Sequence, residues 1–362
     1  MLPYYLLIGV PILFSAFQNK HKPKELRNKL PIILFFAMLL ILLSIRSMSC
    51  GTDLPVYYDL FKIHHLSLYK NISFWSLFDL TLTEPGYILL EKISFFVSGG
   101  EFQFLLVVCA VISLAPLLLL YLKESNHGLL TIALFIGVAP FSLLFSGLRQ
   151  SIAMGIGALC YICVKNKKPI LFLLGVFVAF LFHQSALVLL LMYPVYKMNI
   201  KKQSLLFFFP FLLIILLFNQ QILNAVIGLL GRFGDVYSTT TSTGAYGFLL
   251  LLIVFTIFCF VIPDEHHLPV DSRGLRNFLL IMLIIQCFAP VHTIAMRFNY
   301  YYLIFIPILI PKIIDNCSAN TKQIAKVSVY VMVSFFFAYF FINAYFGSNV
   351  LRIFPYSGYW EG

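Results

Sequence analysis

Apolar blocks of about 14 to 23 residues, separated by short polar joints, dominate this sequence of 362 residues. Blocks of this length can cross a bilayer as helices, whereas a transmembrane β-barrel would show alternating segments of about ten residues. Hydrophobic residues make up 61% of the chain and charged residues only 11%, which excludes a water-soluble enzyme. We therefore expect an all-α, polytopic transmembrane helix bundle that forms a single integral membrane domain over residues 1–362.

About twelve spans fit the apolar blocks. They are residues 2–17, 30–45, 102–122, 129–146, 148–164, 169–182, 184–196, 204–218, 245–262, 276–291, 298–315 and 324–346. The longest polar stretch, 46–101, and a second one, 219–244, are expected to be loops outside the membrane. Residues 86–98 could form a thirteenth span, but this segment is short and contains Glu91 and Lys92, which are costly at the bilayer centre. We expect an interfacial or re-entrant helix there.

The basic residues divide unevenly between alternate joints. One set of joints holds 17 of the 25 basic residues, of which 14 are lysine, and the other set holds eight, of which five are arginine. Cytoplasmic loops carry the excess of basic residues, so we place the lysine-rich joints in the cytoplasm and both termini outside. This distribution also makes nucleic acid a poor explanation for the net charge of +11.

The outer set is rich in arginine, whose planar guanidinium binds phosphate and carboxylate groups bidentately. The clearest candidate is Arg149 in SGLRQS (146–151), at the start of the fifth span, where unpaired backbone N–H groups favour an anion. Gly147, Ser151 and Gly155 recur every four residues and predict close packing of this helix on a neighbour. The alternative for the outer arginines is that they anchor helix ends at the lipid headgroups.

Three further polar residues need an explanation. The outer loop begins RSMSCGTDLPVYYDLF, with Asp53 in a turn, and continues to TEPGY (83–87), where Glu84 precedes a proline that can start a helix. Each carboxylate is a candidate base or sugar-hydroxyl ligand, or alternatively a helix cap. His183, in HQSA, lies between two short apolar runs. It could donate to a phosphate, move a proton, or simply bond to a neighbouring helix.

Two other outer joints are polar. GRFGDVYSTTTSTGAYG (231–247) is predicted to be a mobile loop that carries Arg232 and Asp235. PVHTIAMRFNYYY (290–302) places Arg297 beside three tyrosines at a span boundary. The histidines in loops lack the spacing and acidic partners of a metal site, so we expect no metal and no cofactor.

The order and spacing of several motifs resemble a known family. R-x4-GTD-x3-YY, EPGY, GLRQSIA-x-GI, HQSAL and MRFNYYY, over about residues 30–315, resemble the EpsG family of polysaccharide polymerases. This family is similar to the Wzy-type O-antigen and capsule polymerases. The C-terminal FPYSGYWEG and the loop around residue 235 match no motif of this pattern.

The resemblance implies polymerisation of oligosaccharide repeat units at the outer face of the bacterial cytoplasmic membrane. The donor would be a chain on undecaprenyl diphosphate, the acceptor a new lipid-linked unit, and a chain-length regulator could be a protein partner. Residues expected to bind the diphosphate are Arg46, Arg149, Gln150 and Arg297. Asp53 or Glu84 would orient or deprotonate the acceptor, and His183 would contact the diphosphate or move the proton. Tyr57, Tyr58, Arg232 and Asp235 are further loop contacts. The arginines would replace a metal ion.

Two alternatives stay open. One is a flippase of lipid-linked oligosaccharide, although the sequence shows no internal repeat and its unusual polar residues gather at one membrane face. The other is a related membrane glycosyltransferase, such as an O-antigen ligase, which would use arginines in the same way.

Overall fold

A polar backbone in an apolar environment has to satisfy its hydrogen bonds internally, and a helix does this within one segment. The computed structural model of the chain is accordingly helical along its apolar blocks. It describes residues 1–18, 23–63, 84–138, 141–230, 245–265, 267–292, 294–346 and 351–361. Within these ranges there is no β-strand, only an isolated bridge between Arg46 and Gly358.

The elements follow the order of the sequence blocks. The α-helices are α1 (Leu2–Phe17), α2 (Lys24–Ile45), α3 (Leu54–Ile63), α4 (Pro85–Ser98), α5 (Phe102–Glu124), α6 (Gly128–Gly137), α7 (Leu148–Lys165), α8 (Pro169–Phe182), α9 (Met192–Lys197), α10 (Leu205–Leu217), α11 (Asn219–Leu230), α12 (Ala245–Val261), α13 (Val270–Gln286), α14 (Ile294–Leu303), α15 (Ile306–Asp315) and α16 (Ala319–Phe346). The 3-10 helices are η2 (Ser142–Phe145), η3 (Gln184–Leu191), η4 (Lys202–Ser204) and η7 (Tyr359–Glu361).

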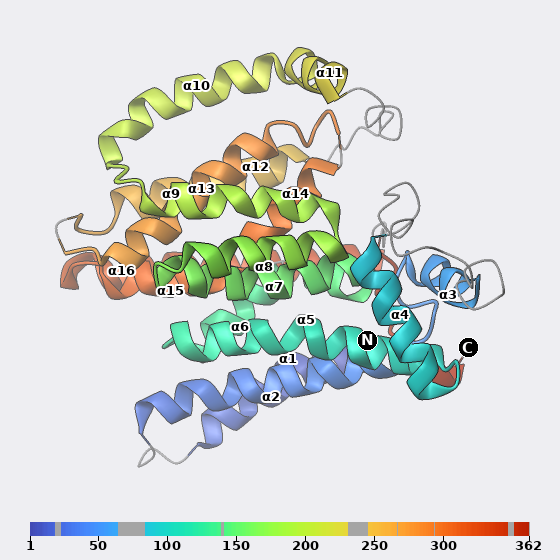
Figure 1. Ribbon diagram of the computed structural model, residues 1–362. Helices are drawn as coiled ribbons and strands as arrows, with labels where there is room; N and C mark the ends of the chain where they lie inside the picture. Colours follow the sequence, from blue (N-terminus) through green and yellow to red (C-terminus); the bar gives the residue numbers. More distant parts are fainter. Residues whose placement is uncertain are drawn as a thin grey trace.

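Most of the long helices lie side by side along one direction, so their joints fall at two ends of a bundle (Figure 1). One end, here called the loop end, carries α3, α4 and both chain termini. The other, here called the lysine-rich end, carries the joints after α5, α7, α12 and α15. The two sets of joints that differ in their basic residues therefore lie at opposite ends of the bundle.

The predicted spans agree with the helices in position but not always in continuity. Each predicted span contains a helix, but within 129–146, 184–196 and 298–315 the helix is interrupted. The first is split into α6 and η2, the second is η3 followed by α9, and the third bends by 47° between α14 and α15. Proline explains the third break, because Pro307 lies in the first turn of α15, where its ring favours the start of a new helix.

The number of membrane crossings stays a prediction. By length and composition, α2 and α5 could each cross a membrane among the described helices, and the count rises to four if the bent pairs α10–α11 and α14–α15 are each one span. Several other apolar helices are shorter. A helix of 14 residues, such as α8, measures roughly 21 Å, whereas the hydrocarbon core is about 30 Å thick.

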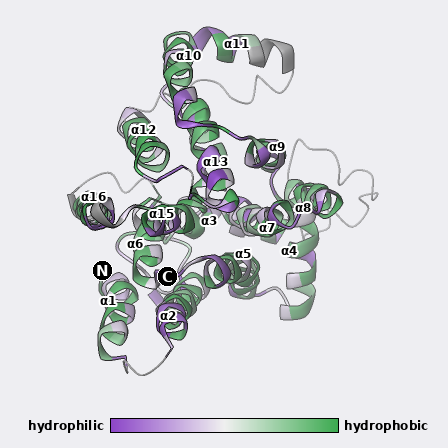
Figure 2. Cartoon of the chain, turned by 90° about the vertical axis from the view of Figure 1, so that its left-hand side faces the viewer, coloured by the Kyte–Doolittle hydropathy of each residue, from purple (hydrophilic) through white to green (hydrophobic). Residues whose placement is uncertain are grey.

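The outward surfaces of the helices are apolar, as expected for contact with lipid. Hydrophobic residues cover most of the outer helices in the view along the bundle (Figure 2). Phe177 on α8, Phe207 on α10 and Leu250 on α12 are 55%, 81% and 62% exposed. Large apolar side chains on several separate helices would be costly in water, and this surface together with the composition identifies a membrane protein.

The helix predicted over residues 86–98 is present as α4. It contacts α5 and α8 and lies crosswise to the bundle at the loop end (Figures 1 and 2). One side of it is buried, including Glu91, while Ile93, Phe96 and Val97 are exposed. This crosswise, one-sided helix supports the interfacial or re-entrant interpretation over a thirteenth span.

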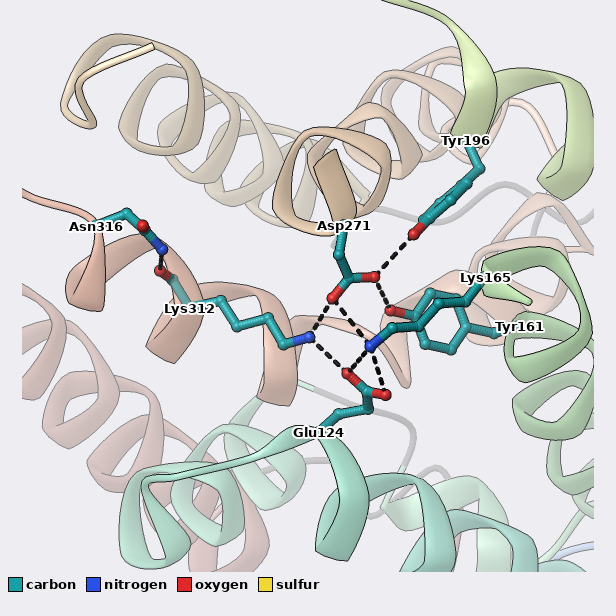
Figure 3. A network of polar contacts seen from close by, with 7 residues as sticks. All are labelled: Glu124, Tyr161, Lys165, Tyr196, Asp271, Lys312 and Asn316. Carbon is teal, nitrogen blue, oxygen red and sulfur yellow. Dashed lines mark hydrogen bonds and ion pairs between the residues drawn. The ribbon is translucent and has the colours of Figure 1, made fainter. Parts of the chain in front are cut away.

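A network of charged side chains joins four helices at the lysine-rich end (Figure 3). Lys165 Nζ lies 2.7 Å from both carboxylate oxygens of Glu124 and 3.4 Å from Asp271 Oδ2. Lys312 Nζ lies 2.6 Å from Glu124 Oε2 and also bonds to Asp271. From sequence, the lysines of these joints are expected only to orient the chain in the membrane, whereas the structure pairs Lys165 and Lys312 with two carboxylates each.

Two tyrosines complete this network. The hydroxyls of Tyr161 and Tyr196 donate to Asp271 Oδ1 at 2.5 and 2.8 Å. The side chain of Glu124 is only 4% exposed. Two carboxylates and two ammonium groups balance in charge, and this balance makes the burial tolerable.

The network gives a stability prediction. We expect Lys312→Met to lower thermal stability clearly, because an uncompensated buried carboxylate costs roughly 3–5 kcal/mol. The double variant Glu124→Gln with Lys312→Met should lose less, since one charge of each sign remains. Thermal unfolding of the purified protein in detergent measures both.

Lys322→Met is the matched control, because Lys322 pairs at 3.6 Å with the partly exposed Asp315 and such pairs contribute under about 1 kcal/mol. A double variant as unstable as Lys312→Met would contradict the charge-balance explanation.

Candidate active site

A cavity of about 230 Å³ opens at the loop end of the bundle. Its lining comes from segments far apart in the sequence: the turn before α3 and α3 itself, the junction of η2 with α7, the end of α8, and α14. The lining residues are Asp53, Val56, Tyr57, Leu60, Leu143, Gly147, Arg149, Gln150, His183 and Arg297. Six of these, Asp53, Tyr57, Arg149, Gln150, His183 and Arg297, are among the residues that the sequence analysis selects.

Glu84 lies behind this lining rather than in it. It immediately precedes Pro85 at the start of α4 and is only 5% exposed. Its Oε2 accepts a hydrogen bond from Arg149 Nη1, and its Oε1 accepts one of 2.9 Å from His183 Nδ1. The backbone N–H of Gln184 lies 3.4 Å from the same Oε1. One buried carboxylate therefore holds the side chains of Arg149 and His183 in place in the cavity wall.

The surroundings of Glu84 determine its charge. Burial raises the pKa of its carboxyl, but the hydrogen bond from His183 and the positive charge of Arg149 outweigh burial and lower the pKa from 4.5 to about 2. Glu84 is therefore ionised at neutral pH. A base would have to reach the substrate and be free to take a proton, so the structure favours a positioning role for Glu84 over the role of base.

Arg149 is fixed on a second side by α3. Its Nε donates to the hydroxyl of Tyr57 at 3.4 Å, and its guanidinium carbon lies 5.6 Å from the centroid of the Tyr57 ring. The side chain is 26% exposed. With two neighbours holding the guanidinium, the cavity receives a positive charge in a preset orientation, at the first turn of α7 where the helix dipole is also positive.

The helix that carries Arg149 is seated closely on α5. A Cβ atom added at Gly155 would lie 2.8 Å from the backbone oxygen of Ser113, so only glycine permits this approach. The prediction of close packing along this face is confirmed at Gly155. The position of Arg149 is therefore set by backbone contact as well as by its polar partners.

His183 ends α8 with an extended backbone, at φ −159° and ψ 120°. This break turns the ring toward Glu84 and the cavity. Because a carboxylate accepts from Nδ1, the hydrogen-bond network assigns the proton to Nδ1 in the neutral ring and leaves Nε2 as an acceptor. In the described part of the chain, Nε2 has no partner, so it is available to a ligand.

Asp53 and Arg297 complete the polar lining. The backbone N–H of Asp53 donates to Ser146 Oγ at 3.1 Å, and Asp53 is the one carboxylate among the residues that line the cavity. Arg297 is exposed, and its backbone carbonyl accepts a hydrogen bond of 2.5 Å from Gln150. Gln150 therefore joins α7 to α14 across the site.

Other selected residues lie elsewhere. Arg46 is 1% exposed, donates to the carbonyl of Leu43 at 2.9 Å, and does not line the cavity. Its guanidinium carbon lies 5.8 Å from the centroid of the Phe145 ring. Tyr58 packs against Phe102, with ring centroids 5.3 Å apart, and also lies outside the lining.

Arg232 and Asp235, predicted as loop contacts in a mobile loop, fall outside the described residues. Three features of the site are not predicted from the sequence. These are the apolar lining residues Val56, Leu60 and Leu143, the hydroxyl of Ser146, and the pairing of Glu84 with Arg149 and His183. Ser146 belongs to the SGLRQS motif, so that motif holds the only signal that could have found it.

Comparison with known proteins gives one match. A family model described as the EpsG family matches residues 29–357, nearly the whole chain. No curated protein matches the chain, and no solved structure does.

The ionised state of Glu84 predicts a pH-dependent contribution to stability. A carboxyl whose pKa falls from 4.5 to about 2 on folding stabilises the fold by roughly 3 kcal/mol at neutral pH. This contribution is complete above the pKa of the unfolded chain and is lost as the pH falls from about 4.5 to about 2. Glu84→Gln should therefore lower the unfolding temperature strongly at pH 7 and much less at pH 3.

The control is Glu101→Gln, since Glu101 is an exposed carboxylate near the same end of the bundle. A gap between wild type and Glu84→Gln that does not change between pH 7 and pH 3 would show that Glu84 does not act through its charge.

Proposed function

Because this chain belongs to the EpsG family, we propose that it is a polysaccharide polymerase that joins lipid-linked oligosaccharide repeat units. The units would be those of an O-antigen, a capsule or an exopolysaccharide. The donor is a growing chain on a polyprenyl diphosphate such as undecaprenyl diphosphate, and the acceptor is a new unit on the same kind of lipid. The protein crosses the bacterial cytoplasmic membrane several times, with the loop end on the outer face.

The cationic cavity at the loop end is the observation that carries this proposal. Arg149, Arg297 and His183 all line it, and the lining includes a single carboxylate, that of Asp53. A diphosphate in a lipid carrier is an anion delivered along the membrane, and arginine binds its oxygens bidentately. The exposed apolar helices around the cavity would let the polyprenyl chain stay in the lipid phase.

The reaction transfers a glycosyl group. A hydroxyl oxygen of the acceptor sugar attacks the anomeric carbon of the donor chain, and the bond between that carbon and the diphosphate oxygen breaks. The electron pair of this bond leaves with the polyprenyl diphosphate, and the hydroxyl proton is lost to a base. Asp53 is the candidate for orienting and deprotonating the hydroxyl, because it lies in the cavity and Glu84 does not.

Arg149 and Arg297 stabilise the charge that develops on the leaving diphosphate. Preorganised positive groups are effective in this role because they need no rearrangement during the reaction. Glu84 orients Arg149 and His183, and it fixes the ring of His183 so that Nε2 faces the ligand. Nε2 of the neutral ring is an acceptor, so His183 can take up and relay the hydroxyl proton, and the ring protonated at Nε2 can then donate to the diphosphate.

Arg149→Ala tests the role of the cationic wall. In a strain that lacks this gene, the wild-type gene should restore a ladder of long surface polysaccharide, whereas Arg149→Ala should leave chains of one repeat unit. Loss of one preorganised donor costs about a hundredfold or more in turnover. Gel analysis of the surface polysaccharide, with protein abundance measured in the membrane fraction, gives the result.

Lys62→Ala is the matched control, because Lys62 is an exposed cation at the end of α3 that does not line the cavity. Normal ladders with Arg149→Ala would contradict the role of Arg149. Complete units trapped at the inner leaflet of the strain without the gene would instead indicate a flippase.

The arginines also predict that polymerisation needs no metal ion. Positive charge at the diphosphate comes from Arg149 and Arg297, so EDTA should change the rate in isolated membranes by less than about twofold. Excess Mg²⁺ added after EDTA is the control. Loss of polymerisation in EDTA that is reversed by a divalent cation would contradict this part of the mechanism.

A further inference from the structure

The C-terminal segment 351–358 is bonded to the turn that carries Asp53. The backbone N–H of Thr52 donates to the carbonyl of Leu351 at 3.2 Å, and that of Ser47 donates to Ser357 at 2.9 Å. Arg46 forms an isolated bridge with Gly358. Residues 46–52 and 351–358 therefore lie along one another at the loop end, where both termini are found (Figure 1).

This segment is packed as well as hydrogen-bonded. The hydroxyl of Tyr4, in α1, donates to the carbonyl of Ile353, and Ile353 is only 2% exposed. The ring of Tyr4 also contacts Phe354 and Tyr356, with centroids 4.7 and 6.1 Å apart. The hydroxyl of Tyr356 in turn donates to the carbonyl of Leu42 at 2.9 Å. The first and last parts of the chain thus hold each other over the end of α2.

The turn also has hydrogen bonds and a close contact of its own. Cys50 N–H donates to Ser47 and Leu54 N–H donates to Gly51, at 3.1 and 3.3 Å. Gly51 has a φ of +139°, and a Cβ atom there would lie 2.2 Å from the backbone oxygen of Phe145. Residues 145–146 thus hold one side of the turn, and the C-terminal segment holds the other.

We propose that residues 351–358 are a positioning element of the active site, which fixes the Thr52–Asp53 backbone so that the carboxylate of Asp53 faces the acceptor. This inference rests on the proposed function for its effect on the reaction, whereas the contact with the turn can be tested without it. The bonds described above join the segment to the cavity lining through this turn, so its expected effect on the reaction passes through Asp53.

The first experiment measures the backbone directly. Hydrogen–deuterium exchange is compared between the full chain and a chain that ends at residue 350. The amides of Thr52 and Asp53 should exchange at least tenfold faster in the shortened chain, while those at the first turn of α7 stay within twofold. Unchanged exchange at Thr52 and Asp53 would overturn the proposal even if the protein proved to have another activity.

The second experiment is a double-mutant cycle on polymerisation by the purified protein. Both the shortened chain and Asp53→Asn should lower kcat by about tenfold or more, with KM for the donor lipid within about threefold. Shortening the Asp53→Asn chain should cost less than a further twofold, because both changes remove the same function. Effects that multiply would show that the segment acts independently of Asp53 and would overturn the proposal.

Two further variants serve as controls for these experiments. A chain that ends at Gly358 removes residues 359–362, and among the described bonds residues 359–361 pair only with Gly358, so its kcat should match the wild type. If the chain that ends at residue 350 does not accumulate, Tyr4→Phe with Tyr356→Phe removes two of the anchoring hydroxyls and keeps the rings. That variant should show the same faster exchange at Thr52 and Asp53, and unchanged exchange would overturn the proposal.

Discussion

A carboxylate buried in a protein has to be paired, and at the loop end of this bundle the pairing of Glu84 organises the site. Arg149 comes from α7, His183 from the end of α8, and Glu84 from the start of α4, so one carboxylate ties three segments together. The shape of the cavity wall depends on these hydrogen bonds to Glu84. Without Glu84, Arg149 would keep only its contact with Tyr57, and the ring of His183 would lose the acceptor that orients it.

The two ends of the bundle use charge differently. At the lysine-rich end, Glu124 and Asp271 balance Lys165 and Lys312, and the tyrosine hydroxyls complete a closed network with no cationic group left over. At the loop end, the cavity lining holds Arg149, Arg297 and His183 with Asp53. A balanced network is suited to holding helices together, whereas an arginine that faces a cavity with its carboxylate partner behind the wall, as Arg149 does with Glu84, is suited to binding an anion.

The sequence predicts local features of this protein better than distant pairings. Three features follow from a few consecutive residues each, and the structure contains all three. They are Arg149 at a helix start, the close packing at Gly155 and the crosswise helix after Glu84. Arg46, predicted to bind the diphosphate, is buried and does not line the cavity, because a charge at the end of a span can have a buried structural role as readily as a role in a ligand site. Hydrophobic periodicity cannot predict contacts between distant segments. Examples are the pairing of Glu84 with His183, 99 residues apart, and the contact of the C-terminal segment with residues 46–52.

We propose that this cavity joins glycan units by displacing a polyprenyl diphosphate. The most direct measurement uses the purified protein in liposomes with a lipid-linked repeat unit as the sole substrate. Lipid-linked glycans of increasing length should appear together with one free polyprenyl diphosphate per bond formed. Repeat units that move between the leaflets at their original length, with no polyprenyl diphosphate released, would contradict the claim and identify a transporter.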